Sequence, residues 1–248
     1  MGIPVLLGLA FAPSIYLMLI IYGKDKYERE PKRILLVAFL LGCVSVIPAG
    51  IIELFLKKPL DFEFLGLGNF ALSAFLGVAL IEELCKFTML RLHAYRLKDF
   101  NEPFDGIVYS VFVSLGFATL ENVFYVLASD GQGVQVAIMR MFTAVPAHYA
   151  FGVIMGYYVG KAKFQPEKRL QYLSLGLFYA TLMHGAYDFF IMQNLYPALG
   201  IFTIGVLLMG LRISKRSIEE LQADSVFRFQ SRPETTGEPQ PRSDTPTS

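Results

Sequence analysis

The chain has 248 residues, of which 54% are hydrophobic and 17% are charged, and its formal net charge is +1. Soluble domains carry about 25% charged residues, so this composition is typical of a membrane protein. The small net charge gives no electrostatic reason to expect a nucleic acid or an acidic partner. The two cysteines, Cys43 and Cys85, lie in apolar runs, and their spacing predicts neither a disulfide nor a zinc knuckle.

Seven apolar segments follow one another along the chain. A helix of about 20 apolar residues crosses a bilayer. We therefore predict an all-α polytopic membrane protein with seven transmembrane helices. The predicted spans are residues 3–22, 34–56, 70–90, 106–129, 134–160, 170–191 and 195–211. Residues 1–213 then form a transmembrane domain, and residues 214–248 form a cytoplasmic tail. From Phe229 onward the tail is too polar to fold, although residues 217–229 are compatible with a short helix.

Basic residues are unevenly divided between the predicted loops. Loops one, three and five hold Lys24, Lys26, Arg29, Lys32, Arg33, Arg91, Arg96, Lys98, Lys161, Lys163, Lys168 and Arg169, whereas the other loops hold only Lys57 and Lys58. Cytoplasmic loops are enriched in Lys and Arg. We therefore expect the N-terminus outside and the C-terminus in the cytoplasm. Since no basic residue precedes the first apolar run, we expect that run to be retained as a span rather than cleaved.

The third predicted span contains three ionisable residues in the sequence Glu82-Glu83-Leu84-Cys85-Lys86. Each such residue at the centre of a membrane helix costs roughly 2.5–3.5 kcal/mol on insertion scales. Lys86 is three or four residues from either carboxylate and can offset its charge. Neighbouring residues differ by about 100° around a helix. We therefore expect one glutamate to activate a water and the other to pair with Lys86, and the spacing does not say which.

Three further spans carry polar side chains that we place in the middle or outer half of the membrane. They are Glu121 and Asn122 in the fourth span, His148 in the fifth, and His184 and Asp188 in the sixth. A shared water-filled cavity that opens outward would explain this clustering. Glu121, His148, His184 and Asp188 form a nitrogen and oxygen donor set for a divalent ion such as zinc. Glu82 or Glu83 would then be the base that activates water.

Each of these residues also has a purely structural interpretation. The charged trio in the third span would then be a buried ion pair, and the histidines and Asn122 would hold helices together by hydrogen bonds. Arg140 would extend to the lipid headgroups, with pairing to Glu53 or Glu121 as the alternative. Glu53 lies near its interface and needs no special role. The glycines repeated every four residues in the fifth span are typical of close helix packing, and they are Gly152, Gly156 and Gly160.

Four motifs occur in order, each in its own span: Glu82-Glu83-Leu84-Cys85-Lys86, Phe117 to Asn122 (FxxxEN), His148 to Gly152 (HxxxG) and His184 to Asp188 (HxxxD). With them the first 211 residues resemble the PrsW family of intramembrane proteases, which is related to the CAAX prenyl endopeptidases and their bacterial homologues. The resemblance implies regulated cleavage of a membrane protein, typically a single-pass anti-sigma factor cut on its extracytoplasmic side. The related enzymes carry a histidine where this chain has Glu121, so a bound zinc ion and a metal-free glutamate mechanism both stay open.

In this interpretation Glu82, Glu83 and His184 are catalytic, and Glu121, His148, His184 and Asp188 bind the metal or hold the water. Lys86 and Asn122 support them. One alternative is a CAAX-type prenyl-protein endopeptidase, which would need cytoplasmic access for a lipidated peptide. A second alternative is a transporter coupled to protons or cations, with the same residues as an ion relay. Transporters usually contain inverted repeats, and none is evident in this sequence.

Overall fold

A computed structural model gives the fold and describes residues 2–57, 59, 66–225 and 227. Within these ranges every regular element is helical, which confirms the predicted all-α class. The helices are α1 (Ile3–Lys24), α2 (Lys32–Leu56), α3 (Leu67–Leu72), η2 (Ser73–Ala79), α4 (Leu80–Leu92), η3 (Ala94–Arg96), α5 (Pro103–Leu127), α6 (Gly133–Phe142), α7 (Ala144–Phe164), η4 (Pro166–Lys168), α8 (Arg169–Met192), η5 (Pro197–Gly200) and α9 (Ile201–Ala223).

Several helical segments are long and apolar enough to cross a membrane, so the chain is a multi-pass membrane protein. Among the described residues the segments that qualify are Ile3–Lys24, Lys32–Leu56, Pro103–Leu127, Gly133–Phe164 and Pro197–Ala223. The two other predicted spans correspond to α8 and to the consecutive helices α3, η2 and α4. These two carry five of the polar motif residues, Glu82, Glu83, Lys86, His184 and Asp188. A count of seven membrane crossings stays a prediction.

Two boundaries differ from those predicted. The fifth span is not one helix, because α6 and α7 are separated at Thr143, whose backbone angles are not helical. Pro146 lies in the first turn of α7, where proline is tolerated, whereas it would disrupt the interior of a single helix. The last helix extends to Ala223 because its later residues, such as Ile218 and Leu221, are buried against the bundle. The disorder predicted beyond Phe229 falls on residues outside the described part of the chain.

Helix α5 is the centre of the bundle. It packs against α1, α2, α4, α6, α7 and α9, and most of its side chains are buried. Its approach to α7 is close enough that a Cβ atom at Gly160 would lie 2.0 Å from the carbonyl oxygen of Pro103. A Cβ at Gly156 would lie 2.4 Å from the carbonyl oxygen of Gly106. The packing role predicted for the glycine repeat is therefore confirmed.

The third apolar segment contains a π-helix, η2, immediately before α4. Single-turn π-helical segments are often found at functional sites. Helix η2 packs against α8. The contact is tight, since a Cβ atom at Gly185 would lie only 2.4 Å from the ring of Phe75. This packing brings the residue next to Gly185, His184, toward the start of α4.

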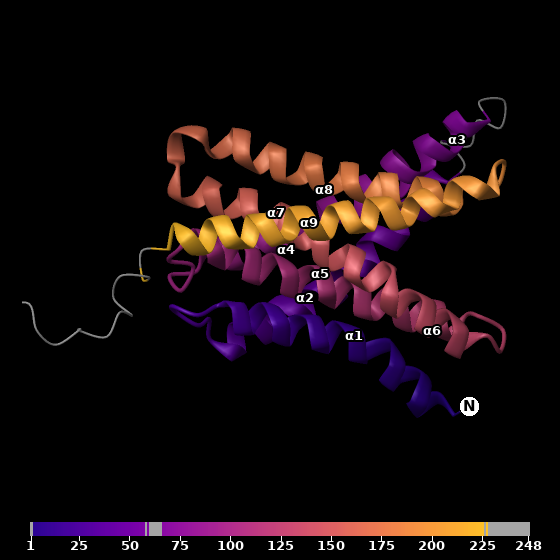
Figure 1. Cartoon of the computed structure of the whole chain (residues 1–248), viewed down its shortest axis with the longest axis horizontal. Coiled ribbons are helices and arrows are strands. Elements are labelled where there is room, and N and C mark those ends of the chain that lie inside the picture. Colours follow the sequence, from indigo (N-terminus) through magenta and orange to yellow (C-terminus); the bar gives the residue numbers. More distant parts are fainter. Residues whose placement is uncertain (1, 58, 60–65, 226, 228–248) are drawn as a thin grey trace, which may run out of the picture.

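The two ends of the bundle carry different connections (Figure 1). One end holds residues 25–31 between α1 and α2, residues 93–102 before α5, and the C-terminal end of α9. The opposite end holds the N-terminus, α3, α6 and the connection between α8 and α9. The basic loops of the sequence lie at the first end. The described N-terminus and the end of α9 therefore lie at opposite ends, as an odd number of crossings requires.

Candidate active site

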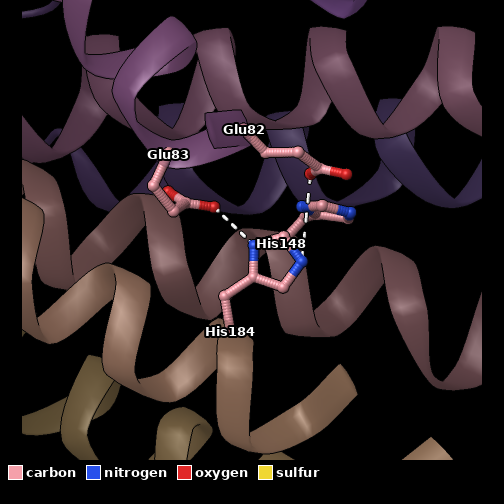
Figure 2. Close-up of side chains that lie close together, drawn as sticks. All are labelled: Glu82, Glu83, His148 and His184. Atoms are coloured by element: carbon pink, nitrogen blue, oxygen red, sulfur yellow. Dashed lines mark hydrogen bonds and ion pairs between the residues drawn. The ribbon is translucent and has the colours of Figure 1, made fainter. Parts of the chain in front are cut away.

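Five helices bring polar side chains to one region inside the bundle. They are Glu82, Glu83 and Lys86 on α4, Glu121 and Asn122 on α5, Arg140 on α6, His148 on α7, and His184 and Asp188 on α8. Figure 2 shows that Glu82, Glu83, His148 and His184 converge from three of these helices. Buried charges are costly unless they are paired and hydrogen-bonded. The contacts of each group therefore determine what this region can do.

Lys86 is the central cation of the site. Its ammonium group donates to Glu82 Oε2 at 3.0 Å, to Glu83 Oε1 at 2.9 Å and to His148 Nδ1 at 3.1 Å. The nitrogen also lies 4.0 Å from the centre of the Phe117 ring. An ammonium group has three hydrogens, so these three acceptors satisfy it completely. The lysine thus contacts both glutamates, whereas the sequence predicted that it would pair with one of them.

The tautomer of His148 follows from its partners. Since Nδ1 accepts a hydrogen bond from Lys86, the proton of the neutral ring lies on Nε2. That Nε2 group donates to Glu121 Oε2 at 3.0 Å. The hydroxyl group of Ser114 donates to the backbone carbonyl of His148 at 2.7 Å and holds this turn of α7 against α5. The Nδ1 lone pair of His148 is therefore directed at the ammonium group that the two glutamates also contact.

Glu121 is part of a second ion pair. Arg140 Nη2 lies 2.8 Å from Glu121 Oε2, and Arg140 Nε donates to Asn122 Oδ1 at 2.9 Å. The amide nitrogen of Asn122 donates in turn to the carbonyl oxygen of Ala10 on α1. Asn122 therefore holds Arg140, and Arg140 holds Glu121 behind the His148 ring. The supporting role that the sequence predicted for Asn122 stays a prediction.

His184 has carboxylates on both sides of its ring. Its Nδ1 group donates to Glu83 Oε1 at 2.9 Å. Its Nε2 lies 3.3 Å from Asp188 Oδ2 and 3.8 Å from Glu82 Oε2. The ring stacks on Phe151 with centroids 4.8 Å apart, which fixes the plane in which the two nitrogens lie. Three acidic groups thus orient one imidazole.

A cavity of about 540 Å³ opens onto these residues. Glu82 lines it, whereas Glu83 does not and has a side chain that is only 1% exposed. The polar lining also includes Glu53, Glu121, Arg140, His148, His184 and Asp188. The remaining walls come from the later parts of α2, α5 and α8, from α6, from the first part of α7 and from η2. The cavity therefore lies toward the end of the bundle opposite the basic loops.

The structure brings every predicted site residue into one network but groups them differently from the predicted ligand set. Glu82, Glu83, His148 and His184 each offer one donor atom, and these atoms lie within 4.8 Å of one another. Glu121 and Asp188 lie outside this group, as hydrogen-bond or ion-pair partners of the two histidines. Helix spacing predicted the pair of His184 and Asp188. The contact between Glu83 and His184 joins two helices, so no pattern of neighbouring residues in the sequence could predict it.

Three residues at the site were underestimated from the sequence. Arg140 pairs with Glu121, which was only the alternative to a role at the lipid headgroups. Glu53 lines the cavity, and Phe151 stacks on His184. Phe151 lies three residues after His148, so helical spacing alone could have placed it on the same side of α7. No local pattern in the sequence identifies the partner of Arg140.

The donor set is chemically suitable for a divalent metal ion. Imidazole and carboxylate groups are the usual ligands of catalytic zinc. The network holds four carboxylates, Glu82, Glu83, Glu121 and Asp188, against two fixed cations, Lys86 and Arg140. Two formal negative charges are left, which one divalent cation would balance. Moreover, Glu83 Oε2 is buried without a hydrogen-bond partner. The described residues therefore fit a metal ion.

Comparison with known proteins assigns the chain to a family. Residues 30–212 match the model of the PrsW family of intramembrane metalloproteases. Protease PrsW of Bacillus subtilis is 39% identical over 222 residues, which cover 88% of this chain and 98% of that protein. Protease PrsW of Geobacillus kaustophilus is 41% identical over 189 residues, covering 76% of this chain and 80% of that protein. No solved structure matches significantly.

These findings confirm the resemblance and favour the protease over the two alternatives, the CAAX-type endopeptidase and the transporter. A further relative, Protease PrsW of Clostridioides difficile, is 36% identical over 204 residues, covering 81% of this chain and 85% of that protein. The predicted activity, peptide-bond hydrolysis in a membrane, agrees with the family. With its polar network inside a bundle of apolar helices, this chain belongs to the PrsW family of intramembrane metalloproteases.

Proposed function

We propose that this protein cleaves a single-pass membrane protein of the anti-sigma-factor type near the extracytoplasmic face of the membrane, and that Glu82 activates the attacking water. The observation that carries this proposal is the difference between the two adjacent glutamates. Only Glu82 lines the cavity, whereas Glu83 is buried behind it and bonded to His184. A water molecule in the cavity can therefore reach Glu82.

The side of cleavage follows from the arrangement of the chain. We assign seven crossings, made by α1, α2, the α3–η2–α4 segment, α5, α6 with α7, α8, and α9. The basic loops lie at one end of the bundle, and the cavity lies toward the other. Because basic loops stay in the cytoplasm, this arrangement supports an extracytoplasmic opening with the N-terminus on the same side. A peptide segment just outside the membrane would then have access to the site.

In this proposal Glu82 takes a proton from the water as the water attacks the scissile carbonyl, which is general base catalysis. Lys86 donates a hydrogen bond to each of the two glutamates and thereby favours their charged forms. The proton that Glu82 takes then passes to the nitrogen of the leaving amine as the peptide bond breaks. His184, held by Glu83 and Asp188, presents its Nε2 side toward Glu82. Arg140 and Glu121 keep His148 in the tautomer whose lone pair faces the site.

We further propose that the metal ion is zinc and that Glu83, His148 and His184 hold it, since their donor atoms lie close together, while Glu82 in the same group stays free to act as the base. The predicted ligands Glu121 and Asp188 would then support His148 and His184 from behind, as carboxylates do for metal-bound imidazoles. When bound, zinc would polarise the scissile carbonyl and favour ionisation of the water. The Nδ1 lone pair of His148 now accepts a bond from Lys86, so the ion and the ammonium group would compete for it.

The experiment is cleavage of a single-pass substrate in liposomes that contain the purified full-length protein, with the cut site mapped by mass spectrometry. We expect a cut near the extracytoplasmic end of the substrate helix and no cleavage by His184→Ala. Glu167→Gln, on the exposed η4 turn, is the matched control and should cleave normally. A cut on the cytoplasmic side, or normal cleavage by His184→Ala, would contradict the proposal.

A further inference from the structure

A second group of buried carboxylates lies at the end of the bundle away from the cavity, where the α1–α2 connection meets the start of α5. We call Asp25, Glu28, Glu30 and Asp105 the acidic cluster. Asp25, Glu30 and Asp105 are no more than 1% exposed. The cluster lies at the end of the bundle that carries the basic loops, at the left of Figure 1. Nothing in the proposed protease reaction uses these residues.

Three of the four carboxylates in the acidic cluster are each held in place through one oxygen. Asp105 Oδ2 accepts from the backbone N–H groups of Asn101 and Glu102, both at 2.8 Å. Glu30 Oε2 accepts from the hydroxyl group of Tyr109. Asp25 Oδ2 accepts from the backbone N–H group of Glu30 at 3.1 Å. These bonds orient the carboxylates and leave their other oxygens available.

Those other oxygens are buried and have no partner. Asp25 Oδ1, Glu28 Oε2, Glu30 Oε1 and Asp105 Oδ1 each lack a hydrogen bond within the described residues. Buried oxygens without partners are rare because each costs about 1–3 kcal/mol. Among the described residues no lysine or arginine forms an ion pair with any of the four carboxylates. Arg29 and Lys163 act on the cluster electrostatically but without a direct ion pair, so no cation contacts the carboxylates within the described residues.

The distances fit one cation. Single oxygens of Glu28, Glu30 and Asp105 all lie within 4.8 Å of one another. Two ligands on opposite sides of a Ca²⁺ ion, each about 2.4 Å away, are also about 4.8 Å apart. The donors are all oxygens, which suits Ca²⁺ or Mg²⁺ rather than zinc.

We infer that the acidic cluster is a binding site for a hard divalent cation, Ca²⁺ or Mg²⁺, distinct from the catalytic centre. Glu28, Glu30 and Asp105 are its ligands, and Asp25 adds negative charge beside them. The ion joins the α1–α2 connection to the first turn of α5. The end of α9 is tied to the same place, since Ser225 donates to Glu102 and Gln222 donates to the carbonyl of Lys24. The ion therefore stabilises the junction that precedes the C-terminal tail.

The test is the melting temperature of the purified full-length protein, freed of metal and then titrated with Ca²⁺ or Mg²⁺. A ligand at 100 times its Kd should raise the melting temperature by about 5–10 °C. We expect this increase in the wild type and in Glu167→Gln, and its loss in Glu30→Gln and Asp105→Asn. The increase should persist in His184→Ala, which separates this site from the catalytic one. The larger effect of Ca²⁺ or Mg²⁺ identifies the ion.

A second measurement does not depend on stability. The chain contains no tryptophan, so Tb³⁺ bound at the cluster would be excited through tyrosine, and Tyr109 is bonded directly to Glu30. We expect Tb³⁺ luminescence that Ca²⁺ displaces and that Tyr109→Phe weakens. The inference would be overturned by a wild-type melting temperature that neither ion changes. It would also be overturned by an equal increase, or equal luminescence, in Glu30→Gln.

Discussion

Replacing Lys86 with methionine tests how the buried network is held together. Lys86→Met keeps an unbranched side chain of similar length but removes the charge and all three hydrogen bonds. The lysine side chain is 2% exposed, and those of Glu82 and Glu83 are 7% and 1% exposed. The substitution therefore leaves two adjacent carboxylates buried without their shared cation.

Loss of one partner from a buried ion pair costs about 3–5 kcal/mol. In a chain of this size each kcal/mol lowers the melting temperature by about 2–4 °C, so we expect a decrease of about 6–20 °C. Lys161→Met is the matched control. Lys161 lies 2.7 Å from Glu220, but its side chain is 21% exposed and that of Glu220 is 49% exposed. Such surface pairs contribute about 0–1 kcal/mol, which predicts a decrease of less than about 4 °C.

The assay can use the two cysteines of the chain. Cys43 and Cys85 are both free and only partly buried, so a thiol-reactive dye reports their exposure as the purified protein unfolds. Glu83→Gln combined with Lys86→Met should recover part of the lost stability, because one of the two uncompensated charges is then absent. A decrease for Lys86→Met no larger than that for Lys161→Met would refute the reasoning.

Three further predictions concern other parts of the site. Arg140→Ala should reduce cleavage about 10- to 100-fold in a kinetic assay because Glu121 loses the cation that holds it behind His148, and Arg140→Lys should recover part of the rate. Gly185→Ala should lower thermal stability by about 1–3 kcal/mol because its Cβ atom would lie 2.4 Å from the Phe75 ring, whereas Gly205→Ala has open space and should be neutral or stabilising. Elemental analysis should find zinc in the wild type, and a chelator should stop cleavage. If the purified protein contains no zinc and still cleaves in the presence of the chelator, a mechanism that uses glutamates without a metal ion is favoured.

The helical class could be predicted from the sequence because apolar runs of membrane length are a local property. The break at Thr143 and the extension of α9 to Ala223 were not predicted. Both depend on packing: α9 continues because residues after the last apolar run, such as Ile218, are buried by other helices. A hydropathy profile detects the apolar run, but it does not detect the contacts with other helices that extend the helix beyond this run.

The sequence predicted which residues form the candidate site, but not which of them contact one another across helices. Ionisable residues inside apolar helices are unusual enough to identify Glu82, Lys86 and His184 individually. Helical spacing predicted that Lys86 reaches either glutamate, but not that it also contacts His148 on α7. The same limit applies to Glu83, whose bond to His184 joins α4 and α8. Contacts between helices depend on their relative positions, which one sequence does not contain.

The difference between Glu82 and Glu83 also needed the structure. Their positions on α4 predicted that they point in different directions. Only the cavity distinguishes the two, since it is lined by Glu82 and not by Glu83. Glu83 instead accepts hydrogen bonds from Lys86 and His184.

The most direct test of the central claim is the cleavage rate of Glu82→Gln in liposomes, measured beside Glu167→Gln at equal protein and substrate. The substitution keeps the size of the side chain and removes its ability to take a proton. Loss of a general base should reduce the rate by about 10²- to 10⁴-fold, while the melting temperature shows that the protein is still folded. A folded Glu82→Gln variant that cleaves as fast as Glu167→Gln would contradict the account.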